Sequence, residues 1–94
     1  MKLIWKLLKS FSDLVFLVKI DGFSCFPFLM PGKYYLAHNF RKPKPGDFVV
    51  FKWEKEVLVK RVIQIKNDYF ILKGIISKDN YQVKAEEILG IVKI

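Results

Sequence analysis

The chain has a single cysteine and a single histidine among its 94 residues. One cysteine excludes an intramolecular disulfide framework, and one cysteine with one histidine is too small a ligand set for a zinc site. We therefore expect no metal and no other cofactor. The fold has to be stabilised by its hydrophobic core alone.

The chain also lacks an uninterrupted apolar run of the ~18–20 residues that a membrane-spanning helix needs. Charged and polar residues interrupt the N-terminal stretch, and its apolar residues recur at helical spacing. This pattern predicts an amphipathic helix over residues 1–13 that rests on an anionic membrane surface. Packing of the same helix against its own domain is the alternative. The expected location is the periphery of a membrane, with the cytoplasm as the alternative. The apolar face comprises Leu3, Ile4, Leu7, Leu8 and Phe11, and the basic face comprises Lys2, Lys6 and Lys9.

What the chain does contain is apolar and basic. Hydrophobic residues make up 52% and aromatic residues 16%, which predicts one small folded domain over residues 1–94. A net charge of +8 favours an anionic partner, although lysines that merely keep a small apolar protein soluble give the same balance. Aromatic residues interleave with lysines, but no known nucleic-acid-binding motif accompanies them. We therefore do not expect a nucleic acid as the partner.

Short β-branched and aromatic runs, separated by turn residues, predict strands. The expected fold class is mainly β: a small coiled or barrel-like sheet over residues 14–94, with one short helix before it. We expect residues 77–81 to form a polar loop. The expected strands are 14–20, 33–38, 48–53, 57–65 and 69–73, with a closing strand within 86–93.

Two side chains stand out within this pattern. Ser24 follows an apolar run in a turn marked by Gly22 and Pro27, and Lys60 lies inside a second apolar run. By strand alternation Lys60 shares a face with apolar neighbours, whereas Arg61 faces the other way. Burial lowers the pKa of a lysine, and a neutral amine in contact with Ser24 could accept its hydroxyl proton. This is the chemistry of a Ser/Lys dyad.

Four segments, in order, resemble the conserved boxes of type I signal peptidases and their LexA-like self-cleaving relatives. Residues 22–27 (GFSCFP) resemble the box around the family's nucleophile, and residues 45–51 (PGDFVVF) resemble its Gly-Asp strand. Residues 59–62 (VKRV) resemble its Lys-Arg-Val box, and residues 77–80 (SKDN), followed by 86–90, are similar to its closing region. Cys25 stands where the family has methionine, and Phe28 stands where threonine is common.

The resemblance implies a Ser/Lys peptidase with a coiled β-sheet. Ser24 would be the nucleophile, Lys60 the general base and Ser77 the residue that orients the lysine amine. The backbone N–H of Ser24 would serve the oxyanion hole. Asp79 would hold the closing loop and pair with Arg61. The implied supporting residues are Gly22, Pro27, Gly46, Asp47, Arg61 and Asp79.

The resemblance further implies a polypeptide substrate, bound as an added strand between residues 18–21 and 57–60. Cleavage would follow small residues, at the end of a signal peptide or of an N-terminal extension of one dedicated protein. The alternative is a non-catalytic basic β-module that binds nucleic acid or a membrane surface.

Overall fold

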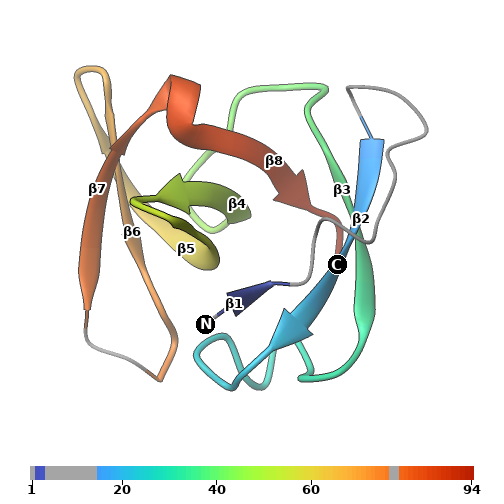
Figure 1. The fold of residues 1–94 in the computed structure, drawn as a ribbon. Helices are drawn as coiled ribbons and strands as arrows, with labels where there is room; N and C mark the ends of the chain where they lie inside the picture. Colours follow the sequence, from blue (N-terminus) through green and yellow to red (C-terminus); the bar gives the residue numbers. More distant parts are fainter. Residues whose placement is uncertain (1, 4–14, 77–78) are drawn as a thin grey trace.

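The computed structural model describes residues 2–3, 15–76 and 79–94. These residues form a strongly coiled sheet with one short 3₁₀ helix, η2 (Ala85–Glu87), near the C-terminus (Figure 1). The sheet confirms the expected mainly β fold. Its strands are β1 (Lys2–Leu3), β2 (Val15–Asp21), β3 (Tyr34–His38), β4 (Phe48–Trp53), β5 (Glu56–Lys66), β6 (Tyr69–Lys73), β7 (Asn80–Lys84) and β8 (Ile88–Val92).

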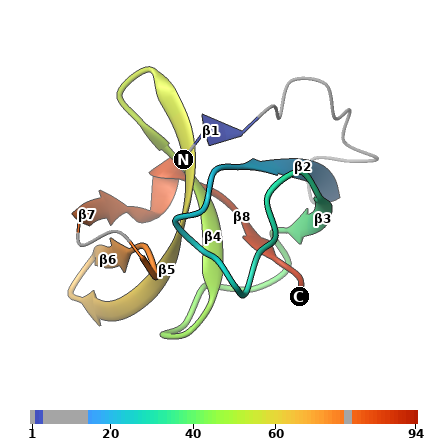
Figure 2. The same ribbon diagram turned by 90° about the horizontal axis from the view of Figure 1, so that it is seen from below.

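All eight strands belong to one antiparallel sheet in the order β1-β2-β3-β8-β4-β5-β6-β7. Among the described residues no pairing joins β7 to β1, so the coiled sheet is open and not a closed barrel. Both views place β1 in the space between β2 and β5 (Figures 1 and 2). This arrangement brings β2 and β5 near each other although they are not neighbours in the sheet.

The predicted N-terminal helix is not supported. Lys2 and Leu3 form a strand that pairs with Asp21 and Ile20 of β2, because the end of β2 offers an unpaired backbone edge. The rest of the predicted helix, residues 4–14, lies outside the described residues. Within the described part of the chain, no helix has both the length and the apolarity to cross a bilayer.

Residues 48–51 of β4 and 58–60 of β5 are buried on both faces of the sheet. Alternate residues of β4 therefore enter two different clusters: Val50 packs with Phe16 and Val18 of β2, whereas Val49 and Phe51 pack with residues of β6 and β7. Burial on both faces explains why residues 48–51 read as a continuous apolar run without alternation. The 58–60 segment of β5 consequently lies between two apolar environments.

The turns between these strands follow the expected chemistry. A two-residue turn joins β4 to β5, with Glu54 at a φ of 55°, and another joins β5 to β6, with Asn67 at 56°. Asparagine tolerates this left-handed conformation better than most residues, which makes residues 67–68 a clear turn signal. The strands expected at 48–53 and 69–73 have the predicted bounds.

Strand β7 is the element that the sequence analysis missed. Residues 77–81 were expected to form a polar loop, yet Asn80 and Tyr81 begin β7 and pair with Lys73 and Leu72 of β6. At this open edge of the sheet only Val83 is fully buried, so the strand keeps a polar composition. A polar edge strand and a polar loop have similar sequences, and only pairing with β6 distinguishes them.

Strand β8 returns across the molecule between β3 and β4. Gly90 is required where β8 passes the Phe16 ring: a Cβ atom added there would lie 2.8 Å from Cε1 of Phe16. This crossing packs the C-terminal strand against β2 and completes the apolar cluster beneath the loop that follows β2.

Candidate active site

The loop between β2 and β3 carries Ser24 at its tip. Gly22, at a φ of 102°, turns the chain out of β2 in a conformation that favours glycine. The N–H of Phe26 donates to the carbonyl of Phe23 (3.0 Å), so Ser24 and Cys25 occupy the centre of a tight turn. Pro27 follows this turn directly. Ser24 is half-buried, whereas the Phe23 and Phe26 side chains on either side are exposed.

Two sets of hydrogen bonds attach this turn to the rest of the protein. The Ser24 carbonyl accepts from the N–H groups of Ile75 (2.6 Å) and Ile76 (3.0 Å), in the segment that leads from β6 towards β7. The Cys25 thiol donates to the carbonyl of Val59 on β5 (3.4 Å). The candidate nucleophile is therefore held against the strand and the loop that carry the other candidate residues.

Lys60 is the one buried charged residue in the described part of the chain, with 2% of its surface exposed. It lies on β5 on the same face as Leu58 and Val62, which confirms the inward orientation that strand alternation predicted. Burial lowers the pKa of its ammonium group from the ordinary 10.5, and the negative charge of Asp79 opposes this in part. A lysine with a lowered pKa has a larger neutral fraction and is a better base.

Lys60 and Ser24 lie in one neighbourhood. Cys25, next to Ser24, donates a hydrogen bond to the carbonyl of the residue before Lys60 and lies close to Lys60. The Cys25 Sγ also lies 3.9 Å from Ser24 Oγ. Burial raises the pKa of the Cys25 thiol, so it stays protonated near neutral pH and packs as a neutral group.

The closing segment also lies near Ser24 and Lys60. Asp79 lies close enough to Lys60 and Tyr81 to raise the pKa of both groups, and the Ser24 carbonyl is bonded to the segment just before Ser77. Ser77 itself lies outside the described residues, so its assigned role stays a prediction. Among the described residues of the implied site, Ser24 is thus linked to β5 through Cys25, and Asp79 lies near Lys60.

Two contacts at this site were not found by sequence reasoning. The Tyr81 ring lies under the Lys60 ammonium, with Nζ 5.6 Å from the ring centroid, and the Cys25 thiol bonds to β5. The sequence pattern predicts a loop at Tyr81. The alternation of half-buried Tyr81, exposed Gln82 and buried Val83 was the available strand signal, and the polar residues before it obscured that signal.

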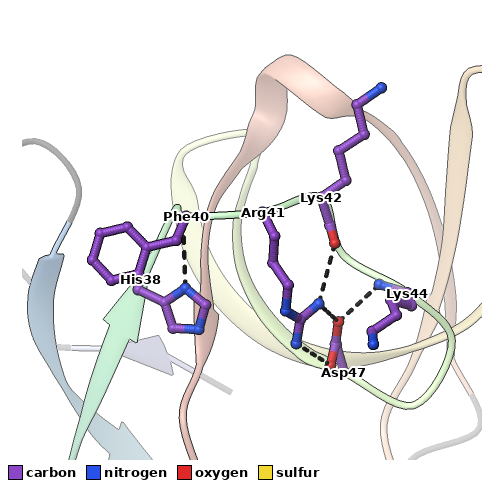
Figure 3. Close-up of polar contacts among 6 residues, drawn as sticks. All are labelled: His38, Phe40, Arg41, Lys42, Lys44 and Asp47. Atoms are coloured by element: carbon purple, nitrogen blue, oxygen red, sulfur yellow. Dashed lines mark hydrogen bonds and ion pairs between the residues drawn. The ribbon is translucent and has the colours of Figure 1, made fainter.

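Gly46 and Asp47 organise the basic connector between β3 and β4, away from Ser24. Asp47 accepts two hydrogen bonds from Arg41 (2.7 and 3.1 Å) and one from the N–H of Lys44 (2.8 Å) (Figure 3). Gly46, at a φ of 98°, donates its N–H to the carbonyl of Val62 and so extends the pairing of β4 with β5. The described contacts give this Gly-Asp pair a structural role.

Asp47→Asn should lower stability, because the Arg41 guanidinium holds the pKa of the Asp47 carboxyl below its ordinary value of 3.8. A lowered pKa stabilises the fold above pH 3.8, and this contribution is lost as the pH falls through the pKa of the folded protein. Since Arg41 is well exposed to solvent, we expect a loss of about 0.5–1 kcal/mol at pH 7. Urea unfolding at pH 7 and pH 2.5 measures it. A difference of equal size at both pH values would contradict the assignment.

Arg61 lies outside the buried cluster around Lys60. Its guanidinium carbon is 5.5 Å from the centroid of the Phe28 ring and 5.8 Å from that of Phe48. The expected pairing of Arg61 with Asp79 stays a prediction.

A cavity of about 800 Å³ lies elsewhere, beside the connector, and includes Phe40, Lys42 and Lys84 in its wall. Among the described residues, no group of three or more His, Cys, Asp or Glu side chains could hold a metal ion.

Comparison with known proteins gives one match. The model of the Peptidase S24-like family matches residues 3–92. No curated protein and no solved structure matches the chain significantly. The matched region includes Ser24, Lys60, Ser77 and Asp79, so it covers the whole candidate site.

Proposed function

Because the chain belongs to the Peptidase S24-like family, within the superfamily of Ser–Lys peptidases, we propose that it is a serine endopeptidase with Ser24 as nucleophile and Lys60 as general base. The observation that carries this proposal is the burial of Lys60 against the turn that holds Ser24. A lysine ammonium buried in an apolar strand weakens the fold. The same burial lowers the pKa of the lysine, so that beside a serine it can act as a base.

In the proposed reaction, Ser24 Oγ attacks the carbonyl carbon of the scissile peptide while its proton moves to Lys60 Nζ. The backbone N–H of Ser24 stabilises the oxyanion. Collapse of the tetrahedral intermediate breaks the C–N bond, and Lys60 returns the proton to the departing amine. Water, activated by the neutral Lys60, then releases the acyl group as a carboxylate and regenerates Ser24.

We propose an extended polypeptide as substrate, with small residues before the scissile bond, from a signal peptide or from an N-terminal extension of a dedicated protein. The strands expected to flank it, β2 and β5, lie on either side of β1 (Figure 2). Since Lys2 and Leu3 pair with the Ile20–Asp21 end of β2, a substrate strand added at that edge would replace β1. The pairing of Lys2–Leu3 with this edge supports the proposed binding of an extended chain there.

The experiment that tests this function is mass spectrometry of a signal-peptide substrate ending in Ala-x-Ala, incubated with the purified protein. We expect cleavage directly after the second alanine. A panel of peptides with larger residues at that position tests the preference for small side chains. If no peptide is cut and Ser24 does not react with a fluorophosphonate probe, the chain is not a peptidase and the non-catalytic binding role replaces it.

We also propose that the protein works at the surface of an anionic membrane. Exposed apolar side chains surround Ser24: Phe23 is 63% exposed, Phe28 48% and Ile76 60%, in a chain of net charge +8. An exposed apolar patch in a basic protein suits the interface of an anionic bilayer.

We expect the protein to float with vesicles that contain anionic lipid, and Phe23→Ser to bind several-fold more weakly because it removes apolar area. Vesicle flotation measures both, with neutral vesicles as the control. Absence of wild-type binding would favour the cytoplasmic alternative, and equal binding by Phe23→Ser would exclude this patch as the contact.

A further inference from the structure

Arg61 lies against a pair of aromatic rings that belong to different parts of the site. Phe28 comes from the loop that carries Ser24, and Phe48 is the residue opposite Arg61 in the pairing of β4 with β5. The guanidinium carbon is within 6 Å of both ring centroids, at 5.5 and 5.8 Å, and the two rings lie 5.8 Å apart. Arg61 follows Lys60 directly on β5. This contact therefore joins the nucleophile loop to the strand of the base.

We propose that Arg61 is a positioning residue for Ser24: with Phe28 and Phe48 it clamps the nucleophile loop against β5. The clamp rests on the proposed function, because its consequence is the placement of the Ser24 hydroxyl relative to Lys60. It acts through the loop and has no contact with the reacting atoms. Nothing in the role of Lys60 as base requires this arrangement.

A chain of short contacts carries the effect from Phe28 to Ser24. The N–H of Leu29, the residue after Phe28, donates to the carbonyl of Cys25 (3.0 Å). Leu29 and Cys25 are fully buried in the same apolar cluster, so this part of the loop moves as a unit. A displacement of Phe28 therefore displaces Cys25 and the adjacent Ser24. Misplacing a nucleophile by a fraction of an ångström is enough to slow its reaction.

The chemistry of the clamp explains the residue types. A planar guanidinium is broad enough to contact two neighbouring rings at once, which the compact lysine ammonium does less well. The position of Phe28 is one where the resembling peptidases commonly have threonine, which offers no ring. A phenylalanine here gives Arg61 its second aromatic face.

The test measures the rate at which a fluorophosphonate probe acylates Ser24 across a range of pH. This probe reports nucleophile placement without requiring a bound substrate strand. We expect Arg61→Lys and Phe28→Leu each to slow the reaction by roughly tenfold at every pH, with an unchanged midpoint. The double variant should be little slower than either single variant, because each change already opens the clamp.

Matched variants separate positioning from other effects. Tyr69→Leu removes the ring of another cation–aromatic pair, Lys84 with Tyr69 at 5.9 Å, far from Ser24, and should leave the rate unchanged. Arg61→Met removes the charge. If Arg61 acted only through its charge on Lys60, Arg61→Met would raise the pKa of Lys60 and move the midpoint upward, while Arg61→Lys would behave as wild type. That result would overturn the proposal, and so would unchanged rates in both Arg61→Lys and Phe28→Leu.

Separate measurements distinguish failure of the proposed function from failure of the clamp. If the wild-type protein does not react with the probe, the peptidase assignment fails, and the clamp is then judged by hydrogen exchange of the Leu29 amide. The clamp predicts faster exchange at Leu29 in Phe28→Leu and Arg61→Lys, and unchanged exchange at this amide in Tyr69→Leu. Equal protection of Leu29 in all four proteins would overturn the clamp.

Discussion

Ser24→Ala should reduce peptide hydrolysis by at least ~10³-fold, because removal of the nucleophile leaves only the contribution of binding and of oxyanion stabilisation. The fold should persist. Ser24 is attached to the protein through its backbone carbonyl, which accepts from Ile75 and Ile76 and remains in the variant. The measurement is the rate of peptide cleavage, followed by mass spectrometry, together with a thermal melt.

The control for Ser24→Ala is Cys25→Ala, which removes the neighbouring thiol. Because Cys25 is buried and its pKa is raised, it does not act as the nucleophile. Its loss removes the hydrogen bond to Val59 and should slow hydrolysis far less than the loss of Ser24 does. Hydrolysis that survives in Ser24→Ala but disappears in Cys25→Ala would reverse the assignment. A variant of Ser24 that fails to fold would be recognised from its melt, and Ser24→Gly would then replace it.

Lys60→Met should abolish hydrolysis and at the same time stabilise the protein. Methionine keeps most of the apolar volume of the lysine stem and removes the buried charge, whose desolvation is the main cause of the lowered pKa of Lys60. Each unit by which the pKa is lowered corresponds to about 1.4 kcal/mol. Loss of the base removes the group that accepts the Ser24 proton, so activity and stability should change in opposite directions.

Activity and the stability gain of Lys60→Met should both depend on pH, because both follow the protonation of Lys60. Wild-type activity requires neutral Lys60 and should rise with pH, reaching its plateau above the pKa of Lys60 in the folded protein and below 10.5. The stability gain of Lys60→Met should be full below that pKa and should shrink as the pH rises to 10.5, where the unfolded chain also loses its proton. Urea unfolding across this range measures the difference. A gain that does not change with pH would mean that Lys60 is not a buried cation.

Asp79 influences the pH at which Lys60 loses its proton. Its carboxylate raises the pKa of Lys60 against the effect of burial, so Asp79 sets how high the pH must rise before the base is neutral. The same carboxylate and burial together raise the pKa of Tyr81. At Lys60, burial lowers the pKa and the Asp79 carboxylate opposes this, so both influence the working pH of the proposed dyad.

Local sequence patterns were enough to predict the strands with strong signals and to identify the main candidate residues. The apolar runs at 48–53 and 69–73 gave their strands, and the inward position of Lys60 followed from alternation with Leu58 and Val62. These properties depend on neighbouring residues only, because side chains alternate along a strand whatever it pairs with. The resemblance of the four boxes likewise indicated the family without the tertiary structure.

The tertiary structure alone decided the features that depend on distant parts of the chain. The polar segment at Asn80–Lys84 became an edge strand because β6 offered it a partner, and Lys2–Leu3 became a strand because the edge of β2 was open. The Tyr81 ring under Lys60 and the Phe28 ring over Arg61 join residues at least 21 positions apart. Such contacts leave no local pattern, since the coiling of the sheet brings these side chains together.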